Sequence, residues 1–192
     1  MYKLITAPTS EPIITSDAKT HLRITHTDQD DYIDSLVKLA RFQFESDCPS
    51  IQILPATWCL YLDEWMDEVM IKKNPLISVS SVKYYAEDSD TLSTLSSANY
   101  ETDLISYPGR VNFSISTSSL PNLNTNKYNA VQITFTCGYA DAASVPSDII
   151  GGLKLLIGHF YENPQQVMSG TQINELPFGY KQIINNYIKN WV

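Results

Sequence analysis

A chain of 192 residues with 43% hydrophobic and 11% aromatic residues can bury a core, so disorder is excluded as its main state. A formal net charge of -8 excludes a general nucleic-acid binder, because such proteins need a basic face to neutralise phosphates. The start, MYKLITAPTS, lacks the apolar core of a signal peptide, and no segment approaches the length of a membrane span. We therefore expect a soluble intracellular protein without a membrane partner.

Two helices are predicted in the first quarter of the chain, after a loose N-terminal arm. The first is short and covers residues 17–23. The second begins near Thr27, whose hydroxyl can cap it, and runs for about five turns. Its apolar residues recur at helical spacing and predict one buried side: Ile33, Leu36, Val37, Ala40 and Phe44. Aspartates crowd its first turn, where the helix dipole favours anions, so a calcium loop is not needed to explain them.

From Pro55 the apolar residues alternate with polar ones, which predicts half-buried antiparallel strands. The clearest alternation covers residues 57–62, 111–116 and 131–137. Residues 69–72 and 77–85 are weaker strands, and the second changes phase around Ser80 and Ser81, where a bulge would realign it.

Turns and loops separate these strands. Pro108 and Gly109 occupy the middle positions of a type II turn, which predicts a hairpin between residues 100–104 and 110–115. Two segments rich in Ser, Thr and Asn, residues 87–99 and 116–129, are predicted loops. The three cysteines, Cys48, Cys59 and Cys137, are odd in number and far apart, so they indicate neither disulfides nor a metal knuckle.

Residues 145–163 give the longest and most apolar helical signal in the chain. Pro146 suits the first turn, and Asp148 places negative charge at the positive end of the helix. Gly151 and Gly158 lie on the side opposite the apolar arc, next to Lys154. The missing side chains would let another backbone approach closely, and a neighbouring subunit is one candidate. The alternative is that these glycines face solvent.

A last amphipathic helix is predicted after a compact apolar turn at residues 176–179. Its apolar side is formed by Tyr180, Ile183, Ile184, Tyr187, Ile188 and Trp191. None of the end helices can bury its stripe alone, so we expect an α+β fold in which N- and C-terminal helices pack together around an inserted antiparallel β lobe. The expected parts are residues 1–54 (N-terminal arm and helices), 55–140 (β lobe) and 141–192 (C-terminal helices).

Candidate chemistry is sparse. His159 and Glu162 stand one helical turn apart, a spacing used by metal ligands, but two groups do not make a site. The sequence contains no HExxH, paired-cysteine, P-loop, GxGxxG or GxSxG motif. We therefore expect no enzyme, no metal and no cofactor. A small-ligand or glycan-binding β module is the alternative function, with Tyr84, Tyr85, Tyr100 and Tyr107 as possible surface aromatics.

Taken together, these segments resemble the head-tail connector (adaptor, or head-completion) proteins of tailed double-stranded DNA phages. The likeness covers about residues 14–187. It is carried by the order and spacing of these pieces: 18–24 (AKTHLRI), Thr57-Trp58, Pro75 with Val79, Val82 and Tyr84, Tyr100, Pro108-Gly109-Arg110, 135–139 (FTCGY), Val145-Pro146, 159–163 (HFYEN) and 175–179 (ELPFG).

The resemblance implies a structural virion protein of the capsid vertex and neck, made in the host cytoplasm. Family members form a ring, typically of twelve copies, beneath the portal, extend the DNA channel and join neck, stopper or tail proteins. Genomic DNA would pass without sequence-specific binding, helped by an acidic ring that repels it. Tyr187, Ile188 and Trp191 are the expected portal-docking residues, and Gly151, Lys154 and Gly158 are the expected subunit-packing residues.

Overall fold

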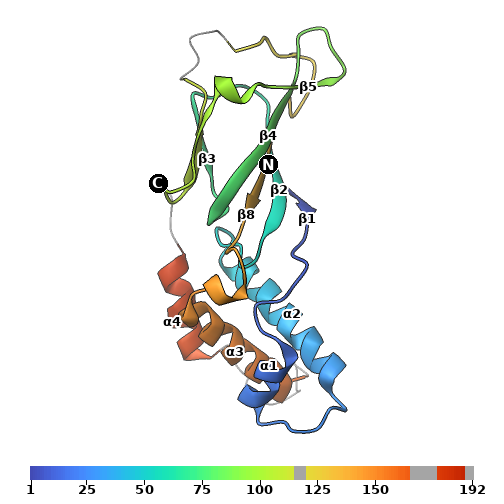
Figure 1. The fold of residues 1–192 in the computed structure, drawn as a ribbon, viewed down its shortest axis with the longest axis vertical. Coiled ribbons are helices and arrows are strands. Elements are labelled where there is room, and N and C mark those ends of the chain that lie inside the picture. The colour runs from blue at the N-terminus through green and yellow to red at the C-terminus, as the bar shows by residue number, and fades with distance from the viewer. Residues whose placement is uncertain (115–119, 165–176, 189–192) are drawn as a thin grey trace, which may run out of the picture. The chain divides into compact units, whose positions relative to one another are not determined.

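The computed structural model describes residues 1–114, 120–164 and 177–188 (Figure 1). The chain divides into two compact units, each built from two separate stretches of sequence. Met1–Pro8 and Pro55–Tyr139 form the first, here called the sheet unit. Thr9–Leu54 and Ala140–Val192 form the second, the helical unit. Helices from both ends of the chain thus share one unit while antiparallel strands lie between them in sequence, which confirms the predicted α+β class.

The sheet unit contains two antiparallel sheets. The larger has the strand order β1-β2-β8-β4-β5, with β1 Tyr2–Thr6, β2 Ala56–Leu62, β8 Val131–Cys137, β4 Leu76–Tyr85 and β5 Leu92–Thr94. The smaller has the order β3-β7-β6, with β3 Glu68–Ile71, β7 Gly109–Asn112 and β6 Glu101–Asp103. A short 3-10 turn, Ser97–Asn99, precedes β6.

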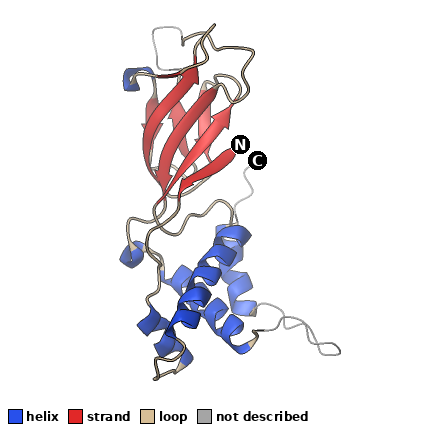
Figure 2. Cartoon of the chain, turned by 90° about the vertical axis from the view of Figure 1, so that its right-hand side faces the viewer, coloured by secondary structure: helices blue, strands red, loops and turns tan. Residues whose placement is uncertain are grey.

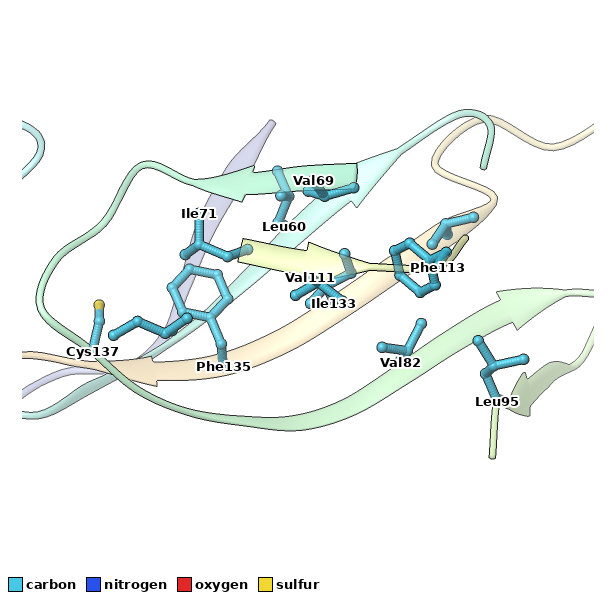
Figure 3. Close-up of a cluster of buried hydrophobic side chains, with 12 residues drawn as sticks. Leu60, Val69, Ile71, Val82, Leu95, Val111, Phe113, Ile133, Phe135 and Cys137 are labelled. Carbon is cyan, nitrogen blue, oxygen red and sulfur yellow. The ribbon is translucent and has the colours of Figure 1, made fainter. Parts of the chain in front are cut away.

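One hydrophobic core joins the two sheets (Figure 3). In β8, alternate residues are buried from Val131 to Cys137, as the sequence predicted. Side chains of β3 and β7, including Val69 and Val111, enter the same cluster as Ile133 and Phe135 of β8. Each inner face covers the other, because a half-buried sheet must place its apolar side against a second layer.

The strand β4 confirms the predicted bulge. Its pairing with β8 shifts between Val79 and Ser81, so Ser80 is the extra residue that restores the inward phase of Val82. The hairpin of β6 and β7 also forms, but its predicted type II turn is wrong. The Tyr107–Pro108 bond is cis, and Gly109 already pairs with Ile71 in β7. A Cβ on Gly109 would lie 2.5 Å from the Leu76 Cδ2, so packing rather than turn geometry requires this glycine.

Two other predictions for this unit need correction. The N-terminal arm is not loose, because residues 2–6 pair with β2 as the edge strand β1. Tyr2 fixes it: its ring meets Phe135 edge-on at 6.1 Å, and its hydroxyl accepts a hydrogen bond from the backbone N–H of Lys72 at 2.9 Å. The polar segment 87–99 is not entirely a loop, since β5 within it pairs with β4.

The helical unit contains α1 Thr15–Leu22, α2 Asp30–Asp47, α3 Ser147–Glu162 and α4 Phe178–Tyr187 (Figure 2). Helix α2 buries the face that its periodicity predicted, and α3 buries most of its apolar arc, with Ile150 and Tyr161 half-buried. The buried residues of α2 are Ile33, Leu36, Val37, Ala40 and Phe44, and those of α3 are Ile149, Gly152, Leu153, Leu156, Ile157 and Phe160. No helix in the described parts of the chain is long and apolar enough to cross a membrane.

Polar contacts hold the segments around α2 in place. The Arg41 guanidinium binds both oxygens of Glu11, at 2.7 and 3.2 Å, and one oxygen of Glu45 at 3.0 Å. Burial lowers the pKa of Arg41, but the two carboxylates outweigh this effect, so the pKa is raised overall. The other oxygen of Glu45 accepts from the Gln52 side chain and the Ile53 N–H, at 2.7 and 3.0 Å.

The helix starts differ from prediction: α1 begins at Thr15 instead of residue 17, and Pro146 precedes α3 instead of lying in its first turn. Helix α2 begins at Asp30 and not near Thr27. The Thr27 carbonyl instead closes a turn, in which it accepts a hydrogen bond from the Asp30 N–H at 3.1 Å. No side chain caps the helix. Phe178 and Gly179 belong to the first turn of α4 and not to a compact apolar turn, and Phe178 is 75% exposed. Leu176 lies outside the described residues.

Candidate assembly surfaces

A shallow groove lies on the outer side of the three-stranded sheet. Its volume is about 610 Å³, and its lining comes from all three strands and the loop after β6: Glu68, Glu101, Thr102, Asp103, Leu104, Ile105, Arg110 and Asn112. Ile105 at the loop is 98% exposed. The groove therefore combines three carboxylates and one guanidinium with an exposed apolar side chain at its rim.

Asp103 organises this groove. One carboxylate oxygen accepts from the backbone N–H groups of Ile105 and Ser106, both at 3.0 Å, and the other accepts from the Arg110 guanidinium at 2.8 Å. Hydrogen bonds from Ser106 and then from Arg110 hold the pKa of the Asp103 carboxyl well below its usual range. Arg110 also reaches Glu68 at 3.4 Å. The loop that presents Ile105 is thus fixed by a charged side chain.

A second surface is the exposed side of α2, which we call the α2 stripe and define as Tyr32, Leu39 and Phe42. Their exposed fractions are 39%, 44% and 67%. At 100° per residue these three positions fall within an arc of about 80°. Phe42 lies opposite the buried face of the helix, whereas Tyr32 lies at the edge of the arc nearest to it, with its ring 6.2 Å from that of Tyr161. Contiguous apolar residues on a helix exterior usually mark a protein–protein contact. The sequence contains a signal for this surface, because Phe42 is out of phase with the buried residues of its helix.

The predicted subunit-packing residues of α3 have different surroundings. A Cβ on Gly151 would meet no atom within 4 Å, so that position is open. A Cβ on Gly158 would lie 3.6 Å from the His21 Nε2 of α1, so this glycine faces its own chain. Lys154 is half-buried. Gly152, which the sequence reasoning did not single out, is the buried glycine, and it packs against Ile183 and Phe44.

The predicted portal-docking residues lie at the end of α4. Tyr187 is its last residue, and its hydroxyl donates to both carboxylate oxygens of Asp148 at 2.8 Å. Its ring meets Phe44 at 6.2 Å. Ile188 follows in extended backbone and is 46% exposed. Trp191 lies outside the described residues.

The residues considered for chemistry do not come together as a site. His159 is in the last turn of α3, and its ring lies 5.9 Å from that of Phe160. Among the residues that the structure describes, no group of three His, Cys, Asp or Glu side chains could hold a metal ion. Two of the four tyrosines of the glycan alternative pack within the sheet unit: Tyr84 contacts Trp65, and Tyr100 contacts Phe113. Tyr85 and Tyr107 are half-buried.

Three solved structures share this fold over the whole chain. The match to a chain in the neck of an empty GTA particle with C6 symmetry has a TM-score of 0.78 at 20% identity. A chain in the virion of a native gene transfer agent (GTA) particle matches with a TM-score of 0.79 at 18% identity. A chain in the native GTA neck with C12 symmetry matches with a TM-score of 0.74 at 19% identity. Each comparison covers 100% of this chain and 97% of the other. At such identities the likeness shows the fold alone.

No curated protein matches the sequence. The sequence model of one family, described as phage gp6-like head-tail connector protein, matches residues 15–115. This range is more than half of the 192 residues and includes α1, α2 and both strands of the β6–β7 hairpin. It contains several pieces that carried the resemblance, from Ala18 to Arg110. The chain belongs to the phage gp6-like head-tail connector family.

Proposed function

We propose that the chain is a non-catalytic adaptor of the virion neck that assembles as a ring of twelve copies beneath the portal. The ring extends the DNA channel and presents a surface to the next neck, stopper or tail protein. Genomic DNA passes through it without sequence-specific binding. The observation that carries this proposal is the family match over residues 15–115. The C12 symmetry of a neck whose chain shares this fold supports the copy number.

A ring places two different surfaces of each copy in contact, because rotation brings one side of a subunit against the other side of the next. The α2 stripe supplies an apolar side. The exposed side of α3 supplies the other, where Gly151 leaves room for a neighbouring side chain and Lys154 adds positive charge beside it. We assign Gly151 and Lys154 to this contact, with Gly158 supporting it indirectly through its packing on α1.

Portal docking is assigned to the end of α4. Tyr187 is held by Asp148, so the helix end is anchored at the point where the chain leaves it. Ile188 is the first exposed apolar residue beyond that anchor. We propose that Ile188 and Trp191 contact the portal and that Tyr187 positions them.

Negative-stain imaging of the purified protein mixed with its portal tests the assembly. Annular particles or capped portals are expected. Phe42→Asp should abolish the rings and leave the monomer folded, while Tyr128→Asp, at a residue that is 88% exposed in the sheet unit, should not affect them. Ile188→Asp should weaken portal capping more than Asn185→Asp on the exposed side of α4. A protein that neither forms rings nor binds the portal would contradict the proposal.

A further inference from the structure

The five-stranded sheet is free of carboxylates, although the chain as a whole is acidic. The chain has 21 acidic and 13 basic residues. None of the acidic residues lies in β1, β2, β8, β4 or β5, and the charged residues of these strands are Lys3 and Lys83. This sheet is therefore a positively charged region within a negatively charged protein.

Both lysines project from the outer side of the sheet. Lys83 lies between Val82, which is buried in the core, and Tyr84, whose ring contacts Trp65. Lys3 follows Tyr2, whose ring contacts Phe135 in the core. Neighbouring residues of a strand point to opposite faces, so both ammonium groups point away from the core. Within the described parts of the chain, neither lysine is within ion-pair distance of a carboxylate.

Most of the other residues of this outer face carry hydroxyl, amide or thiol groups, and Leu92, opposite Tyr85, is an exposed apolar residue on it. The strand register aligns them in rows across the sheet, and Figure 2 looks onto this side of the strands. The rows are Thr57–Thr136–Ser78, then Lys3–Cys59–Thr134–Ser81, then Tyr61–Gln132–Lys83–Thr94. Lys, Ser, Thr, Gln and Tyr are the side chains that donate hydrogen bonds to the phosphates of DNA without reading its sequence.

The outer face of the three-stranded sheet has the opposite character. Its groove contains the carboxylates of Glu68, Glu101 and Asp103 against the single guanidinium of Arg110. Duplex DNA carries one negative charge per about 1.7 Å of its axis, so such a face repels it. Within the sheet unit, charge complementarity therefore selects one face for DNA and excludes the other.

We propose that the outer face of the five-stranded sheet is the surface that meets duplex DNA as it passes through the ring. This inference rests on the proposed function, because it needs DNA to pass through the assembly. Five strands about 4.8 Å apart form a face about 19 Å wide, enough to meet several phosphates. Two lysines in each copy bind few phosphates, and the hydroxyl and amide donors exchange partners readily. The DNA is kept from the acidic surfaces and can still slide.

Site-specific photocrosslinking in assembled particles tests the assignment. A benzophenone amino acid is placed at Lys83, on the outer side of β4, in DNA-filled particles that carry this chain. The matched control is Met70, which is 49% exposed and lies between two core residues of β3, so it points outward from the other sheet. After irradiation and nuclease digestion, DNA fragments attached to the protein are measured. The expected result is DNA attached to the protein at position 83. At position 70, the amount of attached DNA should not exceed that in unirradiated particles.

The outcomes separate this inference from the proposed function. Attachment at position 70 and not at 83, or crosslinks from position 83 to another protein copy, would overturn the assignment of this face and leave the connector role intact. Particles whose necks contain the chain but give no DNA adduct at position 83 would also overturn it. Particles that lack the chain in their necks would overturn the proposed function itself.

Discussion

Replacement of Gly151 by Ala should stabilise the isolated protein. Glycine in a helix interior is about 1 kcal/mol less favourable than alanine, and a Cβ at this position would meet no atom within 4 Å. The free energy of unfolding should therefore rise by about 0.5–1 kcal/mol, which corresponds to a rise in Tm of about 1–4 °C for a chain of this size. Thermal unfolding followed by circular dichroism at 222 nm reports mainly on the helical unit and measures the change.

The matched control is Gly109→Ala in the sheet unit. The new Cβ would lie 2.5 Å from the Leu76 Cδ2 and 2.8 Å from its Cβ, and Leu76 is buried. Overpacking of this kind costs about 1–3 kcal/mol, so this variant should unfold more easily. If Gly151→Ala were as destabilising as Gly109→Ala, the open surroundings assigned to Gly151 would be wrong.

A larger side chain at position 151 should impair assembly, although Gly151→Ala should stabilise the isolated protein. Gly151→Leu keeps a helix-forming residue on an open surface, so the monomer should stay folded. If a neighbouring copy packs closely there, rings should be lost in negative stain and the protein should remain monomeric by light scattering. Rings that form as readily as with Gly151 would refute the subunit-packing role of this position.

Three further predictions concern polar contacts. Arg41→Ala removes the partner of two carboxylates whose side chains are only 15–20% exposed, and chemical denaturation should show a loss of about 2–4 kcal/mol. The pKa of Asp103 is depressed, so the contribution of its carboxylate to holding the loop is present above the ordinary aspartate pKa and is lost as the pH falls from there toward the depressed pKa. The NMR shift of the Ser106 amide should therefore change only in this acidic range. Asp103→Asn should remove that change. Tyr187→Phe removes the hydrogen bond to the exposed Asp148 and should cost less than about 1 kcal/mol in the same denaturation assay.

The sequence predicted those structural features best that follow from the spacing of apolar residues within a single helix or strand. Strand β8 has the predicted bounds because its alternation covers all seven residues, and the buried side of α2 follows from its periodicity. The bulge at Ser80 could be predicted because Val79 and Val82 cannot both face the core in a regular strand. These features depend on local spacing, which a single sequence contains.

Features set by distant partners were missed. Residues 2–6 become β1 only because β2 offers an edge more than fifty residues later, and Tyr2 needs Phe135 to pack on. Gly152 rather than Gly151 faces another helix, a difference of one position that depends on where α4 packs. The groove at Arg110 joins three strands, so it could not be predicted before their order was known.

Cryo-electron microscopy of the neck in particles that encode this chain tests the central claim most directly. The account predicts a closed ring directly beneath the portal, with density that fits the sheet unit and the helical unit in every copy. A portal followed immediately by a different protein, with no copy of this chain in the neck, would contradict it.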